Sequence, residues 1–183
     1  MLLAAALVCA TGAAPAVDRS ESTNGGFGAK LLIVSDTDAF WKEWEQPDTP
    51  HITTTSEISV SAPVFAMIVF HGCSPGGDGK CNVGVTFAIT SPDGSVYDKP
   101  VTADAWGDVP PPGMNLQASL ASMGFQLEPT DKLGTYLISA TLVDRIDGKS
   151  VTMFEEVEAV ADRAPDLPIA NSSRQGEAQQ PVA

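Results

Sequence analysis

The chain of 183 residues has few basic residues, and this shortage bears on its partners. It has 10 Lys and Arg against 23 Asp and Glu, so its formal net charge is −13. Nucleic acids and anionic membrane surfaces need Lys and Arg to neutralise their phosphates. The composition therefore argues against both. We interpret the acidic excess as a feature that keeps the protein soluble. The alternative is that the acidic surface binds cations or a basic partner.

Histidine is scarce as well, which restricts the possible chemistry. Of the two histidines, His51 follows Pro50 in a predicted loop and His71 ends a predicted strand. Nucleophilic catalysis needs a base beside a Ser or Cys, and no nucleophile-elbow sequence is present. No spacing marks a pair of carboxylates for glycoside hydrolysis. We therefore expect no enzyme and no cofactor, with a hydrolytic use of His71 as an alternative.

The N-terminal residues 1–16 form the longest small and apolar stretch, and they end in Ala14–Pro15–Ala16. An apolar segment followed by this type of cleavage site predicts a secretory signal peptide, although no Lys or Arg precedes Arg19. The stretch is too short to span a bilayer as a mature helix, and no other segment is apolar enough. We expect a periplasmic or secreted protein without a transmembrane segment.

The chain has only three cysteines. Cys9 lies in the predicted signal peptide and leaves lipid attachment as an alternative, which Val8 disfavours because that signal prefers a small residue there. Export leaves Cys73 and Cys81 as a pair in an oxidising compartment. The segment between them, SPGGDGK, is rich in turn-forming residues, so we predict a disulfide at a hairpin tip. A metal site built from His71 and both cysteines is the alternative.

Alternating apolar residues predict an all-β domain over residues 30–161. The side chains of Val83, Val85, Phe87 and Ile89 share one face of an expected strand,. Further strands are expected at residues 30–35, 52–61, 63–71, 95–97, 124–128, 135–143 and 150–160,. Such a series of short strands, separated by turn signals, predicts an antiparallel β-sandwich. Residues 17–29 are expected to form a flexible leader and residues 162–183 a disordered tail.

One short helix and one long loop are expected outside the strands. Asp36 or Thr37 caps the helix, the aromatic residues from Phe40 to Trp44 form one of its faces, and Pro47 ends it,. The segment 103–114 contains three successive prolines, so it is predicted to be a stiff loop,.

A tyrosine corner identifies the type of sandwich. In the sequence Asp131–Tyr136, an acidic residue precedes a Gly and then a Tyr, and an alternating strand follows. In immunoglobulin-like domains the hydroxyl of this Tyr binds the backbone a few residues upstream. We therefore predict an immunoglobulin-like sandwich with Tyr136 at the corner. The position of the usual core cysteine is occupied by Ile138.

Several motifs together resemble those of a group of uncharacterised exported bacterial proteins with a single immunoglobulin-like domain. The motifs are the Phe40–Trp44 helix, the Gly72–Cys81 loop, the Ser91–Tyr97 turn, Trp106 with its prolines, and the Glu128–Tyr136 corner. The PDG turn and the GTY corner also resemble sandwich domains of bacterial surface and macroglobulin-like proteins. The resemblance covers residues 31–160 and implies an exported module of this fold, without assigning a functional site.

All three tryptophans lie outside the predicted core strands. Trp41, Trp44 and Trp106 are candidates for a binding surface, because Trp is enriched at binding hot spots,. A small separate core beneath the helix is the alternative for these side chains. We expect a non-enzymatic accessory module that binds another exported protein through loops and sheet edges. Carbohydrate binding through the three tryptophans is a second hypothesis, and metal binding at His71 is a third.

Two pairs of neighbouring carboxylates make calcium a further possibility. Asp36 lies near Asp38, and Asp144 lies near Asp147, but the spacing of a calcium-binding loop is absent,. The sequence favours Asp36 as a helix cap and Asp147 as a turn residue.

Overall fold

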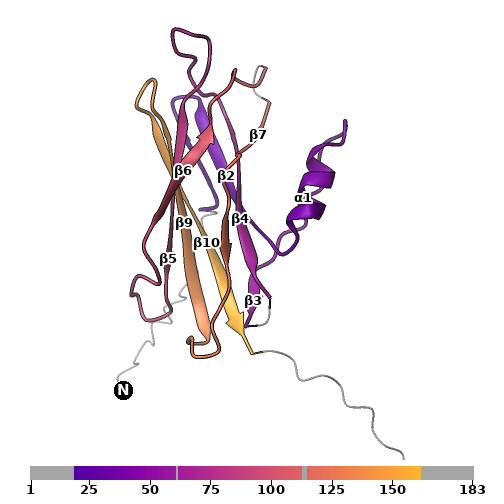
Figure 1. Ribbon diagram of the computed structural model, residues 1–183, viewed down its shortest axis with the longest axis vertical. Coiled ribbons are helices and arrows are strands. Elements are labelled where there is room, and N and C mark those ends of the chain that lie inside the picture. The colour runs from indigo at the N-terminus through magenta and orange to yellow at the C-terminus, as the bar shows by residue number, and fades with distance from the viewer. Residues whose placement is uncertain (1–18, 61, 113–114, 162–183) are drawn as a thin grey trace, which may run out of the picture.

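The protein is a sandwich of two β-sheets with one helix at its side (Figure 1). The computed structural model describes residues 19–60, 62–112 and 115–161. In chain order the elements are β1 (Glu21–Asn24), β2 (Phe27–Val34), α1 (Thr37–Trp44), β3 (Glu57–Ser59), β4 (Val64–His71), β5 (Val83–Thr90), β6 (Val101–Trp106), β7 (Gln117–Ala118), β8 (Met123–Phe125), β9 (Gly134–Asp144) and β10 (Ser150–Val160).

The topology is that of an immunoglobulin-like sandwich, as predicted. Sheet 1 has the order β1-β2-β4-β7, with β8 also paired to β4, and sheet 2 has the order β3-β10-β9-β5-β6. The neighbours are antiparallel except for β3, which runs parallel to β10. The chain changes sheet at five connections, which are β2–β3, β3–β4, β4–β5, β6–β7 and β8–β9.

The main core lies between the inner faces of the two sheets. Strand alternation places every second residue inward, so Tyr136, Ile138, Ala140 and Leu142 of β9 are all buried,. They pack with inward residues of the facing sheet, including Phe27 and Phe70. Burial of these apolar side chains is the main driving force for closing the sandwich.

A second, smaller core lies on the outer face of sheet 1, beneath α1. Asp36 caps the helix, because its Oδ1 accepts a hydrogen bond from the Ala39 N–H at 2.9 Å,. The helix places Phe40 against Met67 and Val69, which are the outward residues of β4. This second core fixes the helix to the sandwich.

The corner before β9 has the hydrogen bond that defines a tyrosine corner. Tyr136 Oη donates to the Lys132 carbonyl at 2.9 Å. The Tyr136 ring also packs against Phe125 and Tyr97, with ring centroids 5.4 and 5.7 Å away. The corner therefore ties the start of β9 to side chains of both layers.

The structure corrects four sequence predictions of local structure. The expected strand at residues 95–97 is only an isolated bridge between Thr90 and Val96. The expected flexible leader, residues 17–29, contains β1 and the start of β2 from Glu21 onward, because a Gly-Gly turn lets a polar edge strand pair with β2. The expected loop at residues 103–114 begins inside β6, since its prolines come only after the strand ends. The expected strand at residues 52–61 is reduced to β3.

The predicted signal peptide, with Cys9, and the predicted tail at residues 162–183 lie outside the described residues. Within the described ranges, no helix has the length and apolar character needed to cross a membrane.

Candidate functional site at one end of the sandwich

Four connections gather at the upper end of the sandwich in Figure 1, and we call this the loop end. They are the β1–β2 turn, the β4–β5 loop that contains Cys73 and Cys81, the segment between β6 and β7, and the β9–β10 hairpin. Each connection is linked to another by contacts described below. The loop end is therefore built from segments far apart in sequence.

The β4–β5 loop is closed by a disulfide, which confirms the predicted cysteine pairing. The predicted hairpin is wrong, because β4 and β5 belong to different sheets and the loop connects the two layers. Cys73 and Cys81 are bonded, with their Cα atoms 6.0 Å apart, and both residues are buried. Inside the loop the Gly76 N–H donates to the Lys80 carbonyl at 2.7 Å. A buried disulfide across so short a loop restricts the conformations available to its tip.

Asp144, at the end of β9, links this loop to the β9–β10 hairpin. Its side chain is fully buried, and its Oδ2 accepts the Ser74 backbone N–H at 2.6 Å. Its Oδ1 accepts the Ile146 N–H at 3.0 Å. A buried carboxylate that accepts two backbone N–H groups satisfies donors that would otherwise be costly to bury.

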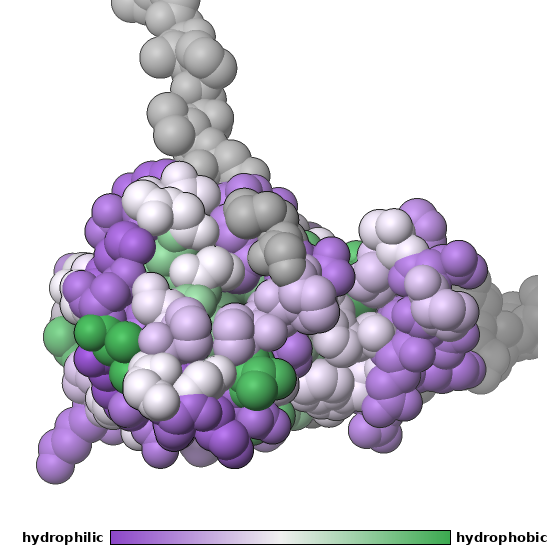
Figure 2. Space-filling view, turned by 90° about the horizontal axis from the view of Figure 1, so that it is seen from above, coloured by the Kyte–Doolittle hydropathy of each residue, from purple (hydrophilic) through white to green (hydrophobic). Residues whose placement is uncertain are grey.

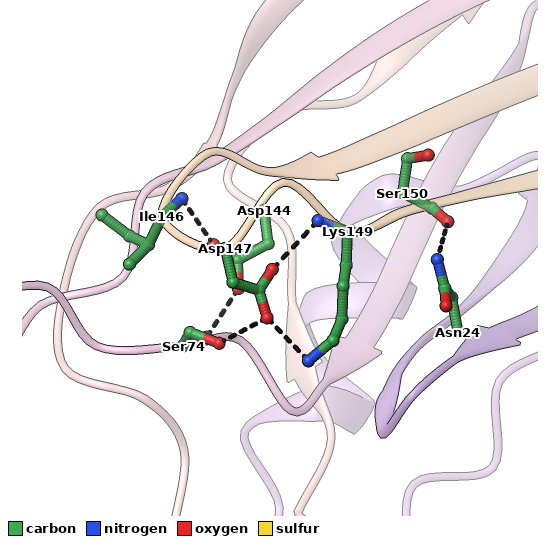
Figure 3. A network of polar contacts seen from close by, with 7 residues as sticks. All are labelled: Asn24, Ser74, Asp144, Ile146, Asp147, Lys149 and Ser150. Atoms are coloured by element: carbon green, nitrogen blue, oxygen red, sulfur yellow. Dashed lines mark hydrogen bonds and ion pairs between the residues drawn. The ribbon is translucent and has the colours of Figure 1, made fainter.

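Asp147 adds a second link between the same two loops, as Figure 3 shows. Its Oδ2 accepts Ser74 Oγ at 2.8 Å and pairs with Lys149 Nζ at 2.6 Å. Its Oδ1 accepts the Lys149 backbone N–H at 3.0 Å. These hydrogen bonds, led by the one from the Lys149 side chain, lower the pKa of Asp147 to about 2,.

The β1–β2 turn is held against the other loops by two contacts. Asn24 Nδ2 donates to the Ser150 carbonyl at 3.2 Å, which joins the turn to the start of β10 (Figure 3). Gly72, with φ of +75°, lies so close to Gly26 that a Cβ would be 2.0 Å from the Gly26 carbonyl oxygen. Only glycine fits at this crossing.

The segment after β6 is tied to the disulfide loop. The Cys81 N–H donates to the Asp108 carbonyl at 2.9 Å, and Lys80 Nζ lies 3.4 Å from the Asp108 carboxylate. Trp106 Nε1 donates to the Val109 carbonyl at 3.1 Å. These bonds fix the start of the proline segment beside the disulfide.

The fixed loops expose three large aliphatic side chains. Ile146 is 45% exposed, Val109 is 58% exposed and Leu116 is 52% exposed. Figure 2, which looks onto this end, shows hydrophobic residues among neutral and hydrophilic ones. The basic side chains here are neutralised within the protein by Lys80–Asp108, Arg145–Asp104 and Lys149–Asp147 ion pairs. The loop end therefore presents aliphatic groups among paired charges.

The predicted tryptophan surface is not assembled as one platform. Trp106 ends β6 of sheet 2, and its ring packs in the main core against Phe70, which lies on the inner face of sheet 1. Trp41 and Trp44 belong to the second core, on the outer face of the same sheet. All three are half-buried. The three rings therefore do not form a common surface that could bind a carbohydrate.

The metal hypothesis used His71 with both cysteines. His71 is half-buried at the end of β4, and its Nδ1 has no hydrogen-bond partner. The two sulfur atoms are joined to each other in the disulfide. Among residues 19–60, 62–112 and 115–161, no three His, Cys, Asp or Glu side chains are grouped as metal ligands. Asp144 and Asp147 instead accept hydrogen bonds from the loops.

Sequence analysis did not identify Ser74, Asn24, Lys149 or the exposed Ile146 as parts of a site. The acidic pair around the hairpin, Asp144 and Asp147, was the available signal; it was considered for calcium, and Asp147 was favoured as a turn residue. The partner of that pair is Ser74, which is 70 residues away from Asp144. A single sequence offers no way to place those segments side by side.

No family model matches the chain, and no curated protein matches it. Solved structures with similarity include the CARDB domain of a Pyrococcus furiosus protein in complex with di-metal ions. The identity there is 14% and the TM-score 0.38, over 76% of this chain and 100% of the other. A family 123 glycoside hydrolase from Clostridium perfringens is similar at 11% identity and a TM-score of 0.43. That match covers 74% of this chain and 27% of the hydrolase. At such scores neither similarity bears on function.

Proposed function

We propose that the protein is an exported, non-enzymatic module that binds another exported protein through its loop end. The observation that carries this proposal is the display of Ile146 and Val109 on loops that are held by Asp144 and by contacts with the disulfide loop, together with the exposed Leu116 directly before β7. Exposed aliphatic side chains on fixed loops lose little conformational entropy when a partner covers them.

The charge distribution supports a protein partner. The cores of protein interfaces are depleted in unpaired charge, and the ion pairs of the loop end leave its basic groups neutralised,. The rest of the chain is acidic, with a net charge of −13 overall. A partner surface with apolar side chains and few charges matches the loop end better than a polyanion does.

Export is supported by the disulfide. A short-loop disulfide persists in an oxidising compartment and is rarely stable in a reducing one,. The apolar residues 1–16 support the same location,.

The proposal is tested by capture from the extracytoplasmic fraction of the source cells. The bait is the mature protein, compared with an Ile146→Asp variant and with a Leu133→Asp control. Leu133 is 54% exposed and lies at the other end of β9, so it matches Ile146 in exposure but not in position. We expect a partner that the wild type and the control retain and the Ile146 variant loses. Equal capture by both variants would reject the loop end as the binding surface.

A further inference from the structure

A second candidate site lies on the other side of sheet 1, beneath α1, and does not depend on the loop end. A cavity of about 270 Å³ separates the helix from the chain that follows it. Its walls combine carboxylates with apolar groups and include Asp36, Ala39, Phe40, Glu43, His51 and Ile52.

The helix contributes one continuous face to this cavity. Asp36, Ala39, Phe40 and Glu43 are spaced at i, i+3, i+4 and i+7, which places them along one side of a helix,. Phe40 is buried and anchored in the second core, so the apolar floor of the cavity is fixed. Glu43 lies one turn after Ala39 on the same wall.

No basic side chain in the described ranges pairs with the carboxylates of this region. Residues 36–48 carry Asp36, Asp38, Glu43, Glu45 and Asp48 against a single basic residue, Lys42. None of the five makes an ion pair with a described residue, whereas five basic residues elsewhere in the described chain are paired. Figure 2 shows the helix side of the molecule as largely hydrophilic.

Glu43 is the central group. It is half-buried on the cavity wall, and its carboxylate accepts no hydrogen bond from a described residue, although its backbone carbonyl accepts the Gln46 N–H. Asp36 uses Oδ1 to cap the helix, and its Oδ2 has no partner in the described part of the chain. Two carboxylate groups beside an apolar floor suit a ligand that has a long aliphatic stem and a cationic head.

We propose that this cavity binds a lysine or arginine side chain of a partner polypeptide. The stem of the basic side chain lies against Phe40 and Ile52, and its head meets Glu43 and Asp36. The described residues offer no group of three metal ligands here, so an organic cation fits the site better than a metal ion,.

The test uses a short blocked peptide, acetyl-Ala-Arg-Ala-amide, and its citrulline analogue, which has the same shape without the charge. Backbone amide chemical shifts are followed by NMR as each peptide is added. We expect saturable shifts centred on Ala39, Glu43 and Ile52 with the arginine peptide, and none with the citrulline peptide. The same experiment with a lysine peptide compares the two basic heads.

Variants that remove one charge distinguish binding in the cavity from non-specific attraction to the acidic surface. Glu43→Gln removes the charge in the same shape, and Asp36→Asn does so while keeping a good helix cap. Each is expected to weaken binding of the arginine peptide about three- to tenfold. Glu45→Gln, on the same helix but outside the cavity, is expected to leave binding unchanged. Thermal unfolding of each variant confirms that the fold is retained.

Shifts that increase linearly over the whole acidic surface, or an equal loss of binding in the Glu43 and Glu45 variants, would overturn the proposal. Both results would indicate non-specific attraction to a protein of high negative charge,.

Discussion

The Ser74 N–H donates to Asp144 Oδ2 at 2.6 Å, and this bond joins two loops that are 70 residues apart in sequence. Ser74 directly follows the first disulfide cysteine, and Asp144 ends the longest strand pair of sheet 2. The disulfide loop and the β9–β10 hairpin are therefore joined directly at Ser74. The display of Ile146 depends on the same carboxylate, because its other oxygen accepts the Ile146 N–H.

Replacing Asp144 with Ala should destabilise the protein by about 2–4 kcal/mol, because two backbone N–H groups lose a charged acceptor,. Urea unfolding followed by tryptophan fluorescence measures this change. Asp147→Ala, in the same hairpin, is the comparison. Asp147 is more exposed than Asp144, so replacing it should lower the free energy of unfolding by a smaller amount. A loss below about 0.5 kcal/mol for Asp144→Ala would contradict the role given to this buried carboxylate.

Asp147 should titrate with a pKa of about 2, below its ordinary value of 3.8, since the Lys149 side chain and backbone stabilise its charged form,. A lowered pKa means that the stabilising effect is complete above about pH 4 and is lost as the pH falls through about 2. NMR of the Asp147 carboxyl carbon follows the titration directly. Lys149→Met should return the midpoint toward 3.8. A wild-type midpoint near 4 would show that the link to Lys149 is not made in solution.

The two tyrosines of the chain should resist ionisation in the folded state. Burial raises the pKa of Tyr97 and of Tyr136 above the ordinary value of 10.0, and the hydrogen bond to Asp131 raises that of Tyr97 further. Their contribution to stability is therefore complete below pH 10 and declines as the pH rises toward the folded-state values. Tyrosinate absorbance should show little ionisation at pH 10 in the native protein and about half in urea. Equal titration in both states would place the tyrosine corner in solvent.

Removing the disulfide by Cys73→Ala together with Cys81→Ala should lower stability by about 2.5 kcal/mol, as expected for a loop of this length,. Chemical unfolding of the wild type with and without reductant gives the same comparison without mutation. Because the strands of both sheets lie outside this loop, the far-UV spectrum should remain that of a β protein. Wild-type stability that is unaffected by reductant would mean that the bond does not constrain the loop.

The local features of the fold could be predicted from sequence because they repeat at short range. The alternation around Tyr136 and in Val83–Thr90 predicted strands with the correct inward faces. Asp36 was identified as a helix cap from its position before an aromatic face. The edge strand β1 could not be predicted, because Glu21–Asn24 is polar and pairs only on one side.

The candidate sites were less predictable because their parts meet through tertiary structure. The cysteine pair was found from its spacing and its turn-rich loop. The tryptophans were grouped together because they share a residue type, yet Trp106 lies on the opposite face of sheet 1 from Trp41. The bond from Ser74 to Asp144 depends on the order of the strands, which the local pattern does not contain.

Site-specific photo-crosslinking tests the proposed use of the loop end most directly. A photoreactive amino acid is placed at Ile146, and at Leu133 as a control of similar exposure at the opposite end. After irradiation of intact source cells, we predict one discrete adduct from position 146 and none from position 133. The same adduct from both positions, or adducts only from position 133, would contradict binding through the loop end.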